Sequence, residues 1–224
     1  MNKTSFLEKI AIQLSNNTES NFTDTVIVLP NKRAKVFLLN EIRKVSKKTL
    51  FSPDIISIEE LIQQISGIRS VDAIEILFEF YEVYLKLTKK EEQESFDVFS
   101  NWAKTAIQDF NEIDRYLIPP NSIFTYLTEI KALERWEVEA TKKTELVDKY
   151  LKFWELLPQY YTEFYNLLQE KKIGYQGLIY REAVSNLSDF TDVKTSQNFI
   201  FAGFNAFSKA EELLFSKWQD EGRC

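Results

Sequence analysis

The sequence predicts an α/β protein, predominantly helical overall, in which an incomplete parallel sheet is interrupted by a large all-helical insertion. Two strand-to-helix segments carry the sheet, 25–34 and 198–211, and we expect their strands to form two edges of one sheet. Between them, apolar residues recur at helical spacing over most of the chain. Only five glycines and five prolines occur in 224 residues, which is typical of long helices.

The first 66 residues alternate between helical and extended patterns. A short amphipathic helix is predicted over Ser5–Leu14, and the apolar run Thr25–Leu29 predicts a buried strand. Pro30 ends this strand because proline has no backbone N–H to donate to a neighbouring strand. Asn31 then has a side chain suited to cap the helix predicted over Lys32–Val45.

A second strand-to-helix unit begins at Ile55–Ser57. Ser57 and Glu60 have the spacing of a capping box, in which each side chain accepts a hydrogen bond from the backbone N–H of the other residue. Gly67 ends the resulting helix. We therefore predict a core domain of residues 1–66 and 198–224, with residues 67–197 as the helical insertion.

The insertion is predicted from apolar residues that recur about every 3.6 residues. Pro158 lies inside the longest tract, where it either kinks one helix or begins a second. Aromatic residues of that tract share one stripe, which favours core packing over a platform for stacked bases. The predicted helices cover 74–85, 99–113, 123–133, 144–172 and 178–187. The stripe of the first helix is Ile74, Leu77, Phe78, Tyr81 and Leu85, and that of the longest tract is Phe153, Leu157, Tyr161 and Phe164.

The sheet is predicted to resume near the end of the chain. A third strand covers Asn198–Ala202, and Ser208 caps a final helix that runs toward Asp220. In a parallel sheet, such a helix connects one strand to the next, but no strand is predicted after it. Because two or three parallel strands are rarely stable without cover for their faces and edges, we expect the chain to be an N-terminal piece of a longer protein.

The residue types present exclude several kinds of chemistry. The chain has no histidine and one cysteine, Cys224, so it has no Ser-His or Cys-His pair, no internal disulfide and no cysteine-based zinc site. We expect no catalytic residue, no metal site and no cofactor in these 224 residues. The N-terminus has no signal peptide and no apolar run approaches about 20 residues, which predicts a cytoplasmic protein with no membrane partner.

Charge is distributed unevenly along the chain. The net charge is -6, yet residues 1–50 hold nine lysines and arginines against four aspartates and glutamates. This asymmetry predicts one basic face on an otherwise acidic protein, as nucleic-acid-binding proteins have. A solvated helix surface is the alternative interpretation.

No segment forms a phosphate-binding loop or a complete nuclease motif. The loop Gly-x4-Gly-Lys-Ser/Thr needs glycines that let backbone N–H groups approach the phosphates, and none of the five glycines fits it. Pro53-Asp54 could open a metal-dependent nuclease signature. No later strand carries the Asp/Glu-x-Lys that would complete that signature.

Two segments resemble conserved blocks of an inactivated superfamily I helicase domain. The block that in active relatives follows the phosphate loop and touches single-stranded DNA is similar to Val26-Ile-Val-Leu-Pro-Asn-Lys-Arg-Ala34. The strand that holds the Walker B acid, in the Gly-Phe form of the B subunit of AddAB-type helicase-nucleases, is similar to Phe199-Ile-Phe-Ala-Gly-Phe-Asn-Ala-Phe-Ser-Lys-Ala-Glu-Glu212. With 53–60 and 107–114, the resemblance covers nearly the whole chain.

The chain is similar to the Bacteroidetes-type PD-(D/E)XK nuclease family, in which a helicase-like N-terminal part precedes a nuclease. The resemblance implies an incomplete P-loop-like sheet of the helicase 1A domain and a 1B-like helical insertion. Ala202 stands at the degenerate Walker B position, where an aspartate would hold Mg²⁺, so ATP hydrolysis is not expected. The full-length protein would be an exonuclease or endonuclease whose cutting residues and divalent metal lie beyond Cys224.

A helicase core without its ATP site can still bind DNA, as a single strand or a duplex end. We expect Asn31, Lys32, Arg33 and Lys35 to contact phosphates, because such sheets place ligands after a parallel strand. The predicted function is a non-catalytic DNA-binding scaffold for double-strand-break repair by homologous recombination. A solvated first turn is the alternative for the four residues. For the chain, the alternatives are a helical module that docks a partner helicase subunit, and an enzyme within these residues.

Overall fold

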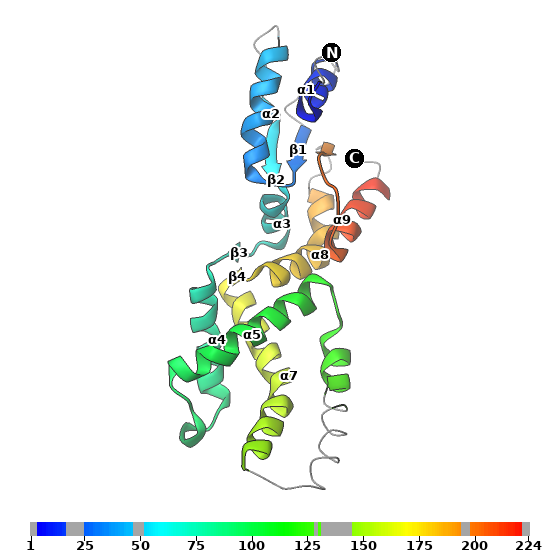
Figure 1. Cartoon of the computed structure of the whole chain (residues 1–224). Helices are drawn as coiled ribbons and strands as arrows, with labels where there is room; N and C mark the ends of the chain where they lie inside the picture. The colour runs from blue at the N-terminus through cyan, green and yellow to red at the C-terminus, as the bar shows by residue number, and fades with distance from the viewer. Residues whose placement is uncertain are drawn as a thin grey trace. The chain divides into compact units, whose positions relative to one another are not determined.

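The computed structural model describes residues 4–16, 25–46, 52–127, 130, 145–193 and 198–220. Most of these residues are helical, and three parallel strands form a small sheet (Figure 1). The chain divides into two compact units, the first of residues 1–67 with 182–224 and the second of residues 68–181. The later boundary lies inside helix α8 (Gln176–Val193), earlier in the chain than the predicted boundary at residue 198.

The sheet of the first unit contains β1 (Thr25–Leu29), β2 (Asp54–Ser57) and β5 (Asn198–Phe201), all parallel, in the order β2-β1-β5. The predicted parallel sheet is therefore confirmed. The prediction that the first and last strands form its two edges is wrong, because β1 lies in the centre. All five residues of β1 are buried, since neighbouring strands and helices cover it on every side.

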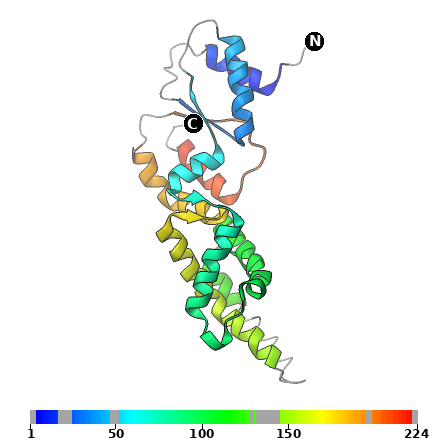
Figure 2. The ribbon, with the colours of Figure 1, turned by 90° about the vertical axis from the view of Figure 1, so that its left-hand side faces the viewer.

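Helices α1 (Phe6–Asn16) and α2 (Lys32–Val45) cover one face of this sheet. Figure 2 shows α2 running alongside the strands. Every second residue of a strand points to the same face, so one set of strand residues packs beneath these two helices. The buried cluster there consists of Ile10, Leu14, Ile27, Leu29, Leu38, Ile55 and Ala202.

Helix α9 (Lys209–Asp220) packs against β5 through aromatic side chains. The Trp218 ring is fully buried, with its centre 5.3 Å from the ring centres of Phe199 and Phe201. Helix α3 (Ile58–Ser66) follows β2 and buries most of its apolar residues. The strands are therefore covered by helices that come from both ends of the chain.

The helix starts in this unit follow their predicted capping residues. Asn31 Oδ1 accepts a hydrogen bond from the Ala34 N–H at 3.0 Å. Ser57 and Glu60 form the predicted capping box, and Ser208 begins α9 with the same reciprocal pair of bonds. Gly67 ends α3 in the left-handed conformation, with φ at 68°. Local sequence signals are sufficient for these boundaries, because the caps at the helix starts join residues three apart and the Gly67 N–H bonds to the Gln63 carbonyl oxygen four residues earlier.

Among its described residues, the second unit consists of helices, the turns that connect them and one short sheet of two strands. Pro158 lies inside a continuous helix and does not begin a second one. Residues 120–127 are helical, and the rest of the helix predicted over 123–133 lies outside the described residues except residue 130. The elements are β3 (Arg69–Ser70), α4 (Ala73–Leu87), a 3-10 turn (Lys90–Glu92), α5 (Phe96–Arg115), α7 (Glu145–Lys171), β4 (Ile173–Gly174) and the start of α8.

Aromatic rings from three helices form the core of this unit. The Phe80 ring centre lies 4.8 Å from that of Phe164 and 5.4 Å from that of Phe99. Leu157, Tyr161 and Phe164 are buried as predicted, which confirms core packing for this part of the α7 stripe. The side chain of Phe153 lies outside the described part of the structure.

The predicted stripe of α4 is wrong in part. Ile74, Phe78 and Leu85 are 67%, 55% and 37% exposed. The core instead takes the opposite side of the helix, because Phe80 inserts among the rings of α5 and α7. The buried residues of α4 are Ile76, Leu77, Phe80, Val83 and Tyr84. Helix α4 therefore has more apolar residues than it buries in the core, and the others are exposed.

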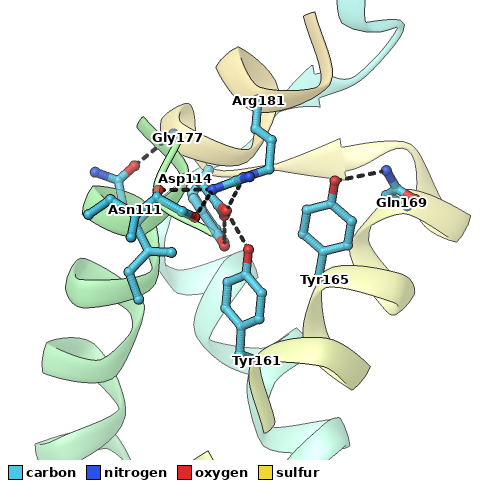
Figure 3. Close-up of polar contacts among 10 residues, drawn as sticks. Asn111, Asp114, Tyr161, Tyr165, Gln169, Gly177 and Arg181 are labelled. Carbon is cyan, nitrogen blue, oxygen red and sulfur yellow. Dashed lines mark hydrogen bonds and ion pairs between the residues drawn. The ribbon is translucent and has the colours of Figure 1, made fainter. Parts of the chain in front are cut away.

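A buried carboxylate joins three helices of the second unit (Figure 3). Asp114, at the end of α5, is fully buried and accepts hydrogen bonds from the hydroxyls of Tyr161 on α7 and Tyr175 before α8. The Arg181 guanidinium on α8 lies with Nε 2.7 Å from Asp114 Oδ1. Its Nη2 donates to the backbone oxygens of Ile113 and Ile118 at 3.0 and 2.7 Å. A buried ion pair is tolerated when its remaining polar atoms find partners, as they do here.

Burial dominates the electrostatics of this Asp114 cluster. It raises the pKa of the Asp114 carboxyl, while the tyrosine hydroxyls and Arg181 act in the opposite direction. Burial also raises the pKa of the Tyr161 and Tyr175 hydroxyls far above 10, and the neighbouring Asp114 charge adds to the effect. Perturbed pKa values often mark catalytic sites. Asp114 has no exposed surface through which a substrate could reach it, so we assign the cluster a structural role.

We predict that Asp114→Ala lowers the free energy of unfolding by about 3–5 kcal/mol, because it leaves the Arg181 charge without its carboxylate. Urea unfolding followed by circular dichroism measures the loss. The control is Asp109→Ala, which removes an exposed carboxylate from the same helix and should change stability by less than about 0.5 kcal/mol. Equal effects of the two substitutions would contradict the structural role.

Stability should fall above pH 10 because of Tyr161 and Tyr175. Each hydroxyl loses its proton near pH 10 in the unfolded chain but keeps it when folded, so the stability is full below pH 10 and decreases as the pH rises. Each tyrosine contributes about 1.4 kcal/mol per pH unit above that point. Urea unfolding at pH 9, 10 and 11 measures how steeply the free energy of unfolding falls with pH. This fall should be less steep in Tyr175→Phe. An unchanged slope in that variant would show that Tyr175 ionises alike in both states.

Candidate nucleic-acid interface

The loops that follow β1 and β5 lie side by side at the carboxyl edge of the sheet. Pro30 and Asn31 follow β1, and Ala202 and Gly203 follow the neighbouring strand. A Cβ atom built on Gly203 would lie 3.6 Å from Pro30 Cδ, and the residue has φ at 85°, which favours glycine. The carboxyl ends of parallel strands are where such sheets bind ligands.

Three cations stand in the first turn of α2 at this edge. Lys32 and Arg33 are exposed and Lys35 is half-buried. Lys32 Nζ lies 3.6 Å from Glu60 Oε1 on α3. Among the described residues, Arg33 and Lys35 form no ion pair within 4 Å. At least two positive charges therefore remain available to an anion here.

Glu60 is an acidic residue that reduces the net positive charge of this cation cluster. The backbone N–H of Ser57 lowers the pKa of the Glu60 carboxyl, and the charges of Lys32 and Lys35 lower it further. The carboxylate is thus ionised at neutral pH, and it partly neutralises the two lysines. An anionic ligand at the edge would compete with Glu60 for Lys32.

Asn31 has a structural role as well as its predicted place at the edge. Its Oδ1 atom is occupied by the Ala34 N–H, so this oxygen fixes the start of α2. The same bond removes the Ala34 N–H from the backbone donors open to an anion. Anion binding at this edge would therefore depend on the side chains of Lys32, Arg33 and Lys35 more than on backbone groups.

Ala202 lies beside this cluster but contributes no polar side chain. It is buried, its N–H donates to the Val28 carbonyl oxygen at 3.0 Å, and its methyl group packs in the core beneath α1 and α2. In the part of the chain that the structure describes, no three acidic, cysteine or histidine side chains gather as a metal site would need. The basic part of the described carboxyl edge is the start of α2, whereas Glu59 and Glu60 lie in the first turn of α3, and Glu211 and Glu212 in that of α9.

Sequence reasoning missed the outward side of α2. Val36 and Phe37 are 60% and 61% exposed, while the next residue, Leu38, is fully buried against the sheet. Arg43 and Lys44 are exposed further along the helix. The spacing of Arg33 and Phe37, four residues apart, could have indicated that a cation and an aromatic ring share one face.

The chain has no match among the models of protein families, and no curated protein matches it either. The described helices include none that combines the length and the apolar character needed to cross a membrane.

We predict that Asn31→Ala lowers the free energy of unfolding by about 1 kcal/mol, because the Ala34 N–H loses its partner at the start of α2. Denaturant unfolding of the whole chain measures this. Asn40→Ala is the control, since Asn40 is exposed in the interior of the same helix, where alanine is favoured. Asn31 would not be a functional cap if both variants unfolded at the same denaturant concentration.

Proposed function

We propose that the first unit is a non-catalytic DNA-binding scaffold of a helicase-nuclease that processes double-strand breaks for homologous recombination. The observation that carries the proposal is the cluster of Lys32, Arg33 and Lys35 at the carboxyl end of a central parallel strand. Phosphates are the anions that this edge of an α/β sheet most often holds. DNA supplies them in a row, so several cations can act together.

The P-loop-like, helicase-derived character of the unit is part of the proposal. It is supported by the order of β1, α2 and β2, by the Asn31-Lys-Arg33 sequence after β1, and by Ala202 at the end of the adjacent strand. Ala202 offers no carboxylate to Mg²⁺, so this unit would bind DNA without hydrolysing ATP. Cutting, and the divalent metal it needs, would belong to a nuclease domain outside these residues.

We predict that the chain binds DNA with an affinity that falls steeply with salt, and that Lys32→Ala/Arg33→Ala weakens the binding. Each phosphate contact that is lost should reduce the slope of log affinity against log salt by about 0.7–0.9. Fluorescence anisotropy with a labelled duplex end and a labelled single strand, at 50–200 mM salt, measures affinity and slope.

Two further variants make this experiment specific. Lys89→Ala/Lys104→Ala removes the same charge from exposed positions of the second unit and should leave the slope unchanged. Glu60→Gln removes the competing carboxylate while keeping a residue that can complete the capping box, so it should tighten binding several-fold. If the Lys32/Arg33 variant and its control behave alike, the site assignment is wrong.

A second candidate function is favoured by the exposed stripe of α4. Ile74 and Phe78 are more than half exposed on a helix whose opposite side forms the core, and large exposed apolar residues that adjoin one another mark protein interfaces. In this alternative the helical unit docks a partner helicase subunit. It predicts no DNA binding at 50 mM salt, and binding to a purified helicase subunit that Phe78→Ser abolishes in calorimetry.

A further inference from the structure

The side of α2 that faces away from the sheet combines positive charge with an aromatic ring. We call it the outward α2 face, and every one of its side chains is exposed. It consists of Lys32, Arg33, Val36, Phe37, Asn40, Arg43 and Lys44. The remaining side chains of α2 are buried or half-buried, so the face is defined by the packing of the helix on the sheet.

Two arginines on this face are available to bind an anion. Lys44 pairs with Glu41 at 2.7 Å, and Lys32 lies near Glu60. Among the described residues, Arg33 and Arg43 have no carboxylate within ion-pair distance. The two are ten residues apart, which places them about 15 Å apart along the helix axis. Arginine also binds phosphate in two-pronged geometry, which lysine does not.

Phe37 lies between these arginines along the helix. Its side chain is 61% exposed and makes no contact with another aromatic ring in the described part of the chain. It follows Arg33 by one helical turn, so the cation and the ring project from the same side. An aromatic ring exposed within a basic surface is the combination that proteins use to bind single strands, in which a base stacks on the ring.

We propose that the outward α2 face binds single-stranded nucleic acid, with one base stacked on Phe37 and with Arg33 and Arg43 each holding a different, non-adjacent phosphate of the strand. This proposal rests on the DNA-binding function proposed above and names the form of nucleic acid and the stacking residue. A single strand is required because the bases of a duplex are already stacked on one another and present no free face.

An anionic membrane surface is the other partner that a basic face with apolar residues fits. Helices that lie on membranes have an apolar stripe along their length. On α2 the exposed apolar residues are limited to Val36 and Phe37, and Leu38 is buried in the core with Leu39 and Ile42 packed against it. The small apolar area favours one stacked base over insertion into a lipid layer.

The test compares two labelled 12-mers with the same phosphates, oligo-dT and a fully abasic strand, binding to the whole chain at 50 mM salt. We expect about ten-fold or more tighter binding of oligo-dT. Phe37→Leu should lose this preference and keep the wild-type affinity for the abasic strand. Val36→Ala, the control on the same face, should keep the preference. Because Phe37 is exposed, neither substitution opens the core.

The outcomes separate this proposal from the function on which it rests. Equal, salt-dependent affinity for the two strands would overturn base stacking and leave phosphate binding intact. No binding of either strand would overturn both proposals. Binding to phosphatidylserine vesicles that Phe37→Leu abolishes, without a preference for oligo-dT, would assign the face to a membrane and overturn the single-strand proposal.

Discussion

The second unit depends on one charge that has no access to water. Asp114 is stable inside the protein only because Arg181 and two tyrosine hydroxyls approach it together, and these groups come from parts of the chain far apart in sequence. Within the second unit, the requirement sets the mutual positions of α5, α7 and the residues 176–181 that begin α8. A backbone contact adds to it, since Gly177 approaches the Asn111 carbonyl so closely that a Cβ atom there would lie 2.2 Å from the oxygen.

The first unit is organised by a different constraint, a strand that is covered on every side. Because β1 is the central strand, α2 begins at the middle of the carboxyl edge of the sheet. Its first turn lies next to the loop after β5. The buried side of α2 supplies apolar contacts to the sheet, and its other side is left to Arg33, Phe37 and Arg43. One helix thus serves both the core and the proposed interface.

Features that depend on neighbours in sequence were predictable, and features that depend on tertiary packing were not. The caps at Asn31, Ser57 and Ser208 follow from side chains three residues from their partners, and the parallel strands follow from continuous apolar runs. The order of the strands, the exposure of Phe37 and the partners of Asp114 depend on which distant segments meet. Periodicity shows that a helix has an apolar side, but α4 has more apolar residues than its core contact uses.

The central position of β1 has a consequence for the order of folding. Its neighbour β5 is made more than 160 residues later, so β1 lacks one of its two partners until residues 198–201 have been synthesised. The second unit is formed by the continuous segment 68–181, and all of its described contacts are available earlier. At about 5–20 residues per second, synthesis takes about 1–4 s to pass from residue 181 to residue 201, so the helical unit can begin to fold before β5 exists. Until then, one side of the apolar β1 is an unpaired strand edge, the kind of edge that promotes aggregation.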